Sequence, residues 1–119
     1  MLIVYAYHGC ATCRNALKFL RSRGVGFEDR AIRDTPPSVE ELRVALRAVE
    51  GDVRKLCNTS GQDYRSLGWK DKLPGMTPEE VLKALSSNGN LIKRPLALDL
   101  DGGLVLVGFK EEQWRRYFT

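Results

Sequence analysis

The sequence has one histidine, three cysteines and no long hydrophobic run among its 119 residues. A structural zinc site uses about four Cys or His ligands. The chain offers only the three cysteines and His8, so no metal site is expected. An odd, low number of cysteines also argues against a secreted disulfide scaffold. No apolar stretch approaches the roughly 18 residues of a membrane span. We therefore expect a cytoplasmic protein with no membrane association.

Positively charged residues are in small excess. The chain has 19 Lys and Arg against 15 Asp and Glu, which gives a net charge of +4. It lacks a dense basic run with interleaved aromatic residues, so nucleic-acid binding is not expected. A mild positive charge fits a solvated basic surface or, alternatively, an electropositive cleft for an oxyanion, a thiolate or an acidic partner. The length predicts one domain over 1–119, and we expect a monomer.

Two of the cysteines form a C-x-x-C motif, Cys10 and Cys13, between the apolar run 1–7 and a helical pattern. A strand that delivers a cysteine to the first turn of a helix places its sulfur beside unpaired N–H groups and the positive end of the helix dipole. These groups favour the reactive thiolate, and Arg14 and Lys18 add positive charge on the same helix. The motif therefore predicts Cys10 as nucleophile and Cys13, about one turn on, as the resolving cysteine.

Hydrophobic periodicity and capping signals give the expected elements. Ser38 with Glu41, and Thr77 with Glu80, form two capping boxes. In chain order, the expected elements are a strand at 2–7, a helix at 11–23, a strand at 26–32, a helix at 38–51, short helical turns within 53–69, a helix at 77–87, strands at 95–100 and 104–107, and a helix at 111–118.

This order is β-α-β, then helical pieces, then β-β-α. The first unit implies two parallel strands joined by a crossover helix, and the last implies a hairpin. We therefore predict an α/β fold on the thioredoxin-like plan. It has a four-stranded mixed sheet made of β-α-β and β-β-α halves, with a helical insertion at about 36–90 between them.

Arg94 and Pro95 precede the strand expected at 95–100. The proline is either a cis-proline at a turn or an ordinary strand start. In the thioredoxin-like plan this turn faces the redox cysteine, where Arg94 would steady a thiolate or bind an oxyanion. The alternative for Arg94 is a surface arginine. The residues expected to play structural or bystander roles are Cys57, His8, Trp69 and Trp114.

Several segments together resemble the arsenate reductase family of thioredoxin-like proteins, the ArsC/Spx group, over essentially the whole chain. The matching segments are residues 7–15 with the cysteine pair, Pro36-Pro37-Ser38, Asn58-Thr59-Ser60-Gly61-Gln62 with Tyr64 and Leu67-Gly68, residues 91–96, and Val107-Gly108-Phe109.

The resemblance implies that Cys10 is the catalytic cysteine and that Arg94, before a cis-Pro95, helps to hold the oxyanion. Arsenate reductases of the family surround the cysteine with three arginines. This chain has Arg94, while Asn58 and Gly108 stand at about the other two positions. The resemblance further implies no bound cofactor, with glutathione and glutaredoxin, or thioredoxin, as electron donor.

Two functions follow. The first is a thiol-dependent oxidoreductase acting on a small oxyanion, a glutathione adduct or a protein disulfide. In it Cys10 attacks, Cys13 resolves, Arg94 stabilises charge and Arg14 keeps Cys10 ionised. The second is an Spx-like redox-sensing transcriptional regulator, in which a Cys10–Cys13 disulfide changes the affinity for the α subunit of RNA polymerase. A purely structural role for the cysteines is the remaining alternative.

Overall fold

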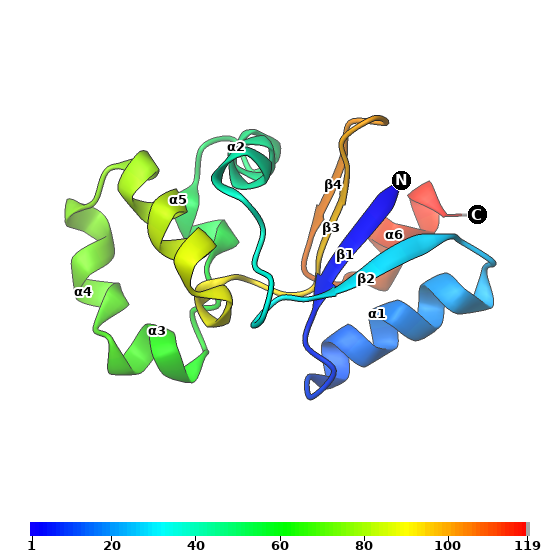
Figure 1. Ribbon diagram of the computed structural model, residues 1–119, viewed down its shortest axis with the longest axis horizontal. Helices are drawn as coiled ribbons and strands as arrows, with labels where there is room; N and C mark the ends of the chain where they lie inside the picture. Colours follow the sequence, from blue (N-terminus) through cyan, green and yellow to red (C-terminus); the bar gives the residue numbers. More distant parts are fainter. Residues whose placement is uncertain (119) are drawn as a thin grey trace.

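The computed structural model describes residues 1–118; Thr119, the last residue of the expected domain, lies outside them. Within this range the strands form one sheet in the order β2-β1-β3-β4 (Figure 1). β1 runs parallel to β2 and antiparallel to β3, and β3 is antiparallel to β4. This arrangement confirms the predicted four-stranded mixed sheet with its β-α-β and β-β-α halves. The strands are β1 (Leu2–Ala6), β2 (Phe27–Ala31), β3 (Leu96–Asp99) and β4 (Leu104–Val107).

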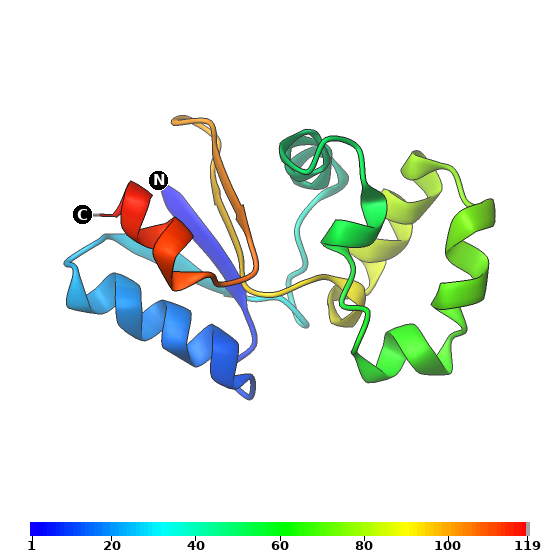
Figure 2. The same cartoon turned by 180° about the vertical axis from the view of Figure 1, so that it is seen from behind.

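Two helices cover one face of the sheet, α1 (Ala11–Ser22) and α6 (Glu111–Tyr117) (Figures 1 and 2). The helical spacing of Leu17 and Leu20 places both side chains in the core beneath the strands, where they are buried with Trp114. Burying each such side chain contributes about 1.5–3 kcal/mol. No helix within residues 1–118 is long and apolar enough to cross a bilayer.

The helical insertion lies against the other face of the sheet. Along β1 the side chains alternate: Val4 and Ala6 belong to the core under α1, while Tyr5 belongs to the core of the insertion. Trp69 and Cys57 are buried in this second core. The insertion consists of α2 (Val39–Ala48), η1 (Val53–Leu56), α3 (Gln62–Ser66), α4 (Trp69–Lys72), η2 (Leu73–Gly75), α5 (Pro78–Ser87) and η3 (Gly89–Leu91).

Both predicted capping boxes start helices of the insertion. The hydroxyl of Ser38 accepts a 3.1 Å hydrogen bond from the backbone N–H of Glu41, and that of Thr77 accepts one of 3.2 Å from Glu80. The first of these helices was expected to run to about residue 51 but ends at Ala48. It ends early because the backbone turns left-handed directly after it, with φ of 57° at Glu50.

Candidate functional site

Cys10 occupies the N-cap of α1, where the chain leaves the sheet. Its backbone is extended, with φ −100° and ψ 123°, and the first turn of the helix carries no acidic side chain. The Cys10 N–H donates to the carbonyl of Tyr7 at 3.0 Å, which closes the loop between β1 and α1. The motif therefore lies at the strand-to-helix junction expected from the sequence, and the Cys10 sulfur lies near the positive end of the helix dipole.

The pKa of the Cys10 thiol is lowered. Partial burial is the largest single influence and opposes ionisation, but several hydrogen bonds to the sulfur together outweigh it. They come from the backbone N–H of Cys13, the Cys13 thiol, the guanidinium of Arg94 and the backbone N–H of Thr12. Hydrogen bonding to the charged form lowers a pKa. Cys10 therefore carries the more reactive sulfur of the pair.

Cys13 has the opposite character. Its side chain is 0% exposed, and both cysteines are free thiols. Burial is the main reason that its pKa rises to about 12, and the charge of the Cys10 thiolate raises it further. Hydrogen bonding to the backbone of Tyr7 offsets part of this rise. Cys10 therefore ionises more readily than an ordinary thiol, while Cys13 stays protonated at neutral pH.

Arg94 reaches the cysteine pair from the segment before β3. The Arg94–Pro95 peptide bond is cis, as one of the two sequence interpretations had it. Pro95 is buried and its carbonyl accepts a 2.8 Å hydrogen bond from Gly108 N–H. The guanidinium of Arg94 lies over the ring of Tyr7, 5.0 Å from its centroid, and favours the Cys10 thiolate. Arg94 is thus a site residue by geometry rather than a free surface arginine.

The role expected for Arg14, to keep Cys10 ionised, stays a prediction. Its Nη1 donates a 2.8 Å hydrogen bond to the carbonyl of His8. It is not among the main influences on the Cys10 pKa. Its contact instead fixes the loop before the motif. The His8 ring is exposed and lies 2.8 Å from Asp29 Oδ2, which agrees with its expected role as a bystander.

Asn58 and Arg94 line one cavity of about 240 Å³. The backbone N–H of Asn58 donates to Leu91 O at 2.8 Å, which anchors the segment beside the chain that leads to Arg94. A Cβ at Gly61 would lie 2.6 Å from Asn58 Nδ2, so a glycine there leaves room for the amide. The full lining consists of Tyr7, Arg33, Asn58, Gly61, Gln62, Asp63, Asn90 and Arg94.

Sequence reasoning missed two residues of this cavity, Tyr7 and Arg33. Arg33 follows β2, and its guanidinium lies 4.7 Å from the centroid of the Tyr7 ring. The signal was available in the predicted β-α-β unit, because parallel strands end at the same edge of a sheet. Ala6 pairs with Ala31, so the residues just beyond these two become neighbours.

Cys57 takes no part in the site. It is buried, and its thiol donates to the carbonyl of Val53 at 3.4 Å. Burial, together with the charge of Asp52, raises its pKa to about 11. It is therefore the inert buried residue that the sequence favoured. Elsewhere in the part of the chain that the structure describes, no three His, Cys, Asp or Glu side chains gather as metal ligands.

The chain is similar to several known proteins. The YusI protein of Bacillus subtilis (strain 168), described as uncharacterized, is 45% identical over 113 residues, which cover 95% of this chain and 94% of the relative. The global transcriptional regulator Spx of Enterococcus faecalis is 29% identical, over 98% of this chain and 86% of its own.

A solved structure has the same fold. The crystal structure of "a possible arsenate reductase" from Streptococcus mutans UA159 superimposes with a TM-score of 0.86 at 36% identity, over 97% of this chain and 98% of that one. The model of the ArsC family matches residues 5–117. The match spans both halves of the sheet and the whole insertion, and the chain therefore belongs to the ArsC family.

Proposed function

We propose that the protein is a thiol-dependent oxidoreductase in which Cys10 is the nucleophile and Cys13 the resolving cysteine. The observation that carries the proposal is that the pKa values of two neighbouring thiols are shifted in opposite directions. The pKa of Cys10 is lowered while that of buried Cys13 is raised to about 12. Unequal sulfurs of this kind are typical of catalytic pairs, because one sulfur attacks while the other is held in reserve.

The reaction proceeds in two exchanges. The Cys10 thiolate attacks one sulfur of a substrate disulfide R–S–S–R′, forms the Cys10–S–S–R bond and releases R′–S⁻. Cys13 then loses its proton to solvent and attacks the Cys10 sulfur, which releases R–S⁻ and leaves a Cys10–Cys13 disulfide. The substrate gains two electrons and the cysteine pair loses two. An external reductant, either the dithiol of thioredoxin or two molecules of glutathione with glutaredoxin, then restores the pair.

The order of the two exchanges follows from charge. Burial dominates the raised pKa of Cys13, but the Cys10 thiolate contributes to it. When Cys10 enters a mixed disulfide, its negative charge disappears, and this contribution disappears with it. Cys13 therefore becomes easier to ionise at the moment when it is needed. Arg94 favours the thiolate before the attack, and its planar fork also suits an oxyanion substrate.

A coupled assay tests the proposal. NADPH oxidation is followed with thioredoxin and its reductase, or with glutathione, glutaredoxin and glutathione reductase, using a disulfide or arsenate as substrate. We expect turnover by the wild-type protein, none by Cys10→Ser, and with Cys13→Ser a mixed disulfide that mass spectrometry detects. Turnover that survives Cys10→Ser would overturn the proposal. Turnover with disulfides but not arsenate would assign the substrate class.

The similarity to Spx favours a second candidate, a redox-sensing regulator that binds the α subunit of RNA polymerase. It uses the same Cys10–Cys13 pair, but the disulfide then changes affinity rather than completing a turnover. A pull-down of the α subunit by the oxidised and the reduced protein distinguishes the two. Binding that depends on oxidation state, together with no turnover in the coupled assay, would support the regulator and reject the enzyme.

A further inference from the structure

One aromatic ring in the site carries two guanidinium groups. Arg33 lies over the ring of Tyr7 at 4.7 Å from its centroid, and Arg94 at 5.0 Å. The two guanidinium carbons are therefore no farther apart than the sum of these distances. Two like charges within this limit repel each other, and an anion bound between them would relieve the repulsion. The ring contact itself is attractive and fixes the orientation of both groups.

Neither arginine is paired with a carboxylate of the described residues, although Arg94 also favours the Cys10 thiolate. Among residues 1–118 no carboxylate forms an ion pair with Arg33 or Arg94, although several other arginines of the chain are paired in this way. The one carboxylate of the cavity belongs to Asp63, and its Oδ2 accepts hydrogen bonds from Asn88 at 3.0 Å and Asn90 at 3.3 Å. The cavity thus contains two guanidinium groups without a carboxylate partner, and one carboxylate that already accepts two hydrogen bonds.

The Tyr7 ring, over which the two arginines lie, is held in place by the neighbouring backbone. A Cβ at Gly9 would lie 2.5 Å from Tyr7 Cζ, so the ring packs directly against the backbone of the loop that leads to Cys10. Arg94 lies over this ring and lowers the pKa of Cys10. Tyr7 and Arg94 both line the cavity, and the Tyr7 carbonyl accepts the Cys10 N–H at 3.0 Å. The cavity is therefore joined through these two residues to the loop that carries Cys10, and it also includes Arg33.

We propose that Arg33, Arg94 and Tyr7 form a carboxylate-binding subsite, which selects small disulfides that carry a carboxylate a few bonds from the sulfur attacked by Cys10. This inference rests on the proposed function and names its substrate class. The carboxylate lies between the two guanidiniums, where it forms charge-assisted hydrogen bonds and relieves their repulsion. Arg33 acts on binding alone, whereas Arg94 serves both the anion and the Cys10 thiolate.

Size and charge decide between classes of substrate. The cavity of about 240 Å³ lies below the roughly 300–1,000 Å³ of sites for drug-sized ligands. It suits a carboxylate with its neighbouring carbon atoms. Cationic disulfides are repelled by both arginines, and neutral ones leave the charges unpaired. Because Arg33 is exposed, its contribution is that of a solvated charge and is screened by salt.

The test uses the first exchange alone and needs no electron donor. The reduced protein is mixed with excess 5,5′-dithiobis(2-nitrobenzoate), which carries a carboxylate on each ring, or with the neutral 2,2′-dithiodipyridine. When Cys10 attacks, the first reagent releases a coloured thiolate and the second releases pyridine-2-thione, and both products are followed by their absorbance. The rate constants of the first phase are compared for the wild type, Arg33→Gln and the control Arg116→Gln. The control removes the same charge from an exposed position on α6.

We expect Arg33→Gln to lower the rate constant for the carboxylate reagent about five- to tenfold and that for the neutral reagent less than about twofold. Arg116→Gln should leave both rate constants almost unchanged. Added salt should slow the carboxylate reagent more strongly in the wild type than in Arg33→Gln, and should leave the neutral reagent almost unchanged. An equal effect of Arg33→Gln on both reagents, or none on either, would overturn the inference. Because no turnover is required, a failed coupled assay would reject the proposed function without affecting this result.

Discussion

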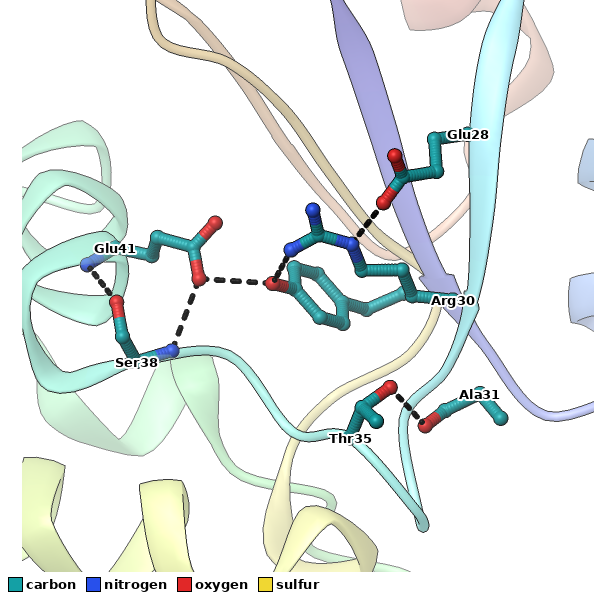
Figure 3. Close-up of polar contacts among 7 residues, drawn as sticks. Glu28, Arg30, Ala31, Thr35, Ser38 and Glu41 are labelled. Atoms are coloured by element: carbon teal, nitrogen blue, oxygen red, sulfur yellow. Dashed lines mark hydrogen bonds and ion pairs between the residues drawn. The ribbon is translucent and has the colours of Figure 1, made fainter.

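The hydroxyl of Tyr5 donates a 2.8 Å hydrogen bond to Oε1 of Glu41, which joins β1 to the first helix of the insertion. The same carboxylate oxygen accepts the backbone N–H of Ser38 at 2.9 Å, so Glu41 caps its own helix and holds the strand at once. Figure 3 shows Arg30 approaching from β2, where its Nη1 donates to the Tyr5 hydroxyl at 2.9 Å and its Nε contacts Glu28. This network fastens the insertion, which supplies Asn58, to the sheet.

Replacement of Tyr5 by Phe should lower the free energy of unfolding by about 1–2 kcal/mol. The ring stays packed, but Glu41 loses a donor and Arg30 loses an acceptor. Urea unfolding of both proteins measures the difference. Tyr64→Phe is the matched control, because the Tyr64 hydroxyl has no hydrogen-bond partner within residues 1–118 although its ring is buried. A loss as large in the control as in Tyr5→Phe would show that the network adds nothing.

The same network predicts a dependence of stability on alkaline pH. Burial, and then the hydrogen bond to Glu41, raise the pKa of Tyr5 from 10.0 to about 12. The folded state therefore keeps a proton that the unfolded chain loses first, and this contribution to stability falls as the pH rises through that interval. We expect the wild type to lose stability over this range more steeply than Tyr5→Phe. Parallel curves from urea unfolding at stepped pH would contradict the assignment.

The reactivity of Cys10 provides a prediction that separates two arginines. Its rate of alkylation by iodoacetamide should reach half its maximum below pH 9.0, the ordinary value for a thiol, because its pKa is lowered. Arg94→Gln should move this midpoint upward, since it removes a group that favours the thiolate. Arg14→Gln should leave it in place, because that guanidinium is bound to the His8 carbonyl. Mass spectrometry identifies the modified cysteine and follows the rate across pH.

An equal upward shift in both variants would mean that only the general positive charge matters. Cys57 provides an internal reference in the same spectra. Its pKa is raised to about 11 by burial and it is held against Val53 O. It should remain unmodified while Cys10 reacts.

Local patterns were sufficient to predict the elements of the fold. Apolar runs placed β1, β3 and β4 to within two residues, because these strands bury apolar side chains. β2 has the sequence FEDRA and no buried residue, so it was placed by its position after α1 rather than by an apolar pattern. Capping boxes placed the starts of α2 and α5. The cysteine pair was recognisable because its chemistry depends on neighbours in the sequence and on the helix end that follows it.

Contacts between distant loops were not predictable in the same way. Tyr7 and Arg33 meet because β1 and β2 pair in one register. The predicted β-α-β unit implied that the two segments end at the same edge, but the pattern within either segment does not contain the register. Arg14 shows a further limit of helical spacing. It lies four residues after Cys10, so helical spacing predicted proximity, but the carbonyl of His8 offered its guanidinium a direct acceptor. The spacing of Cys10 and Arg14 along the helix therefore did not determine which group the Arg14 guanidinium binds.

Gly9→Ala should weaken the selectivity of the site while leaving most of the stability intact. The new methyl group would lie 2.5 Å from Tyr7 Cζ, so the ring must move, and the two guanidiniums that lie over it move too. The rate advantage of the carboxylate reagent over the neutral one should therefore fall. Gly26→Ala is the control, since its methyl group would meet nothing within 4 Å. An unchanged ratio of rates in Gly9→Ala would mean that Tyr7 does not position the arginines.

Gly89→Ala should be the most damaging glycine replacement near the site. Its Cβ would lie 1.8 Å from the carbonyl oxygen of Ile32, and that neighbour is backbone, so it cannot rotate away. The clash separates η3 from the segment that carries Arg33 and should cost about 2–3 kcal/mol of unfolding free energy. In Gly75→Ala the methyl group meets nothing within 4 Å, so urea unfolding should show a change of less than about 0.5 kcal/mol. Equal losses in the two variants would mean that η3 does not hold Arg33 beside the cavity.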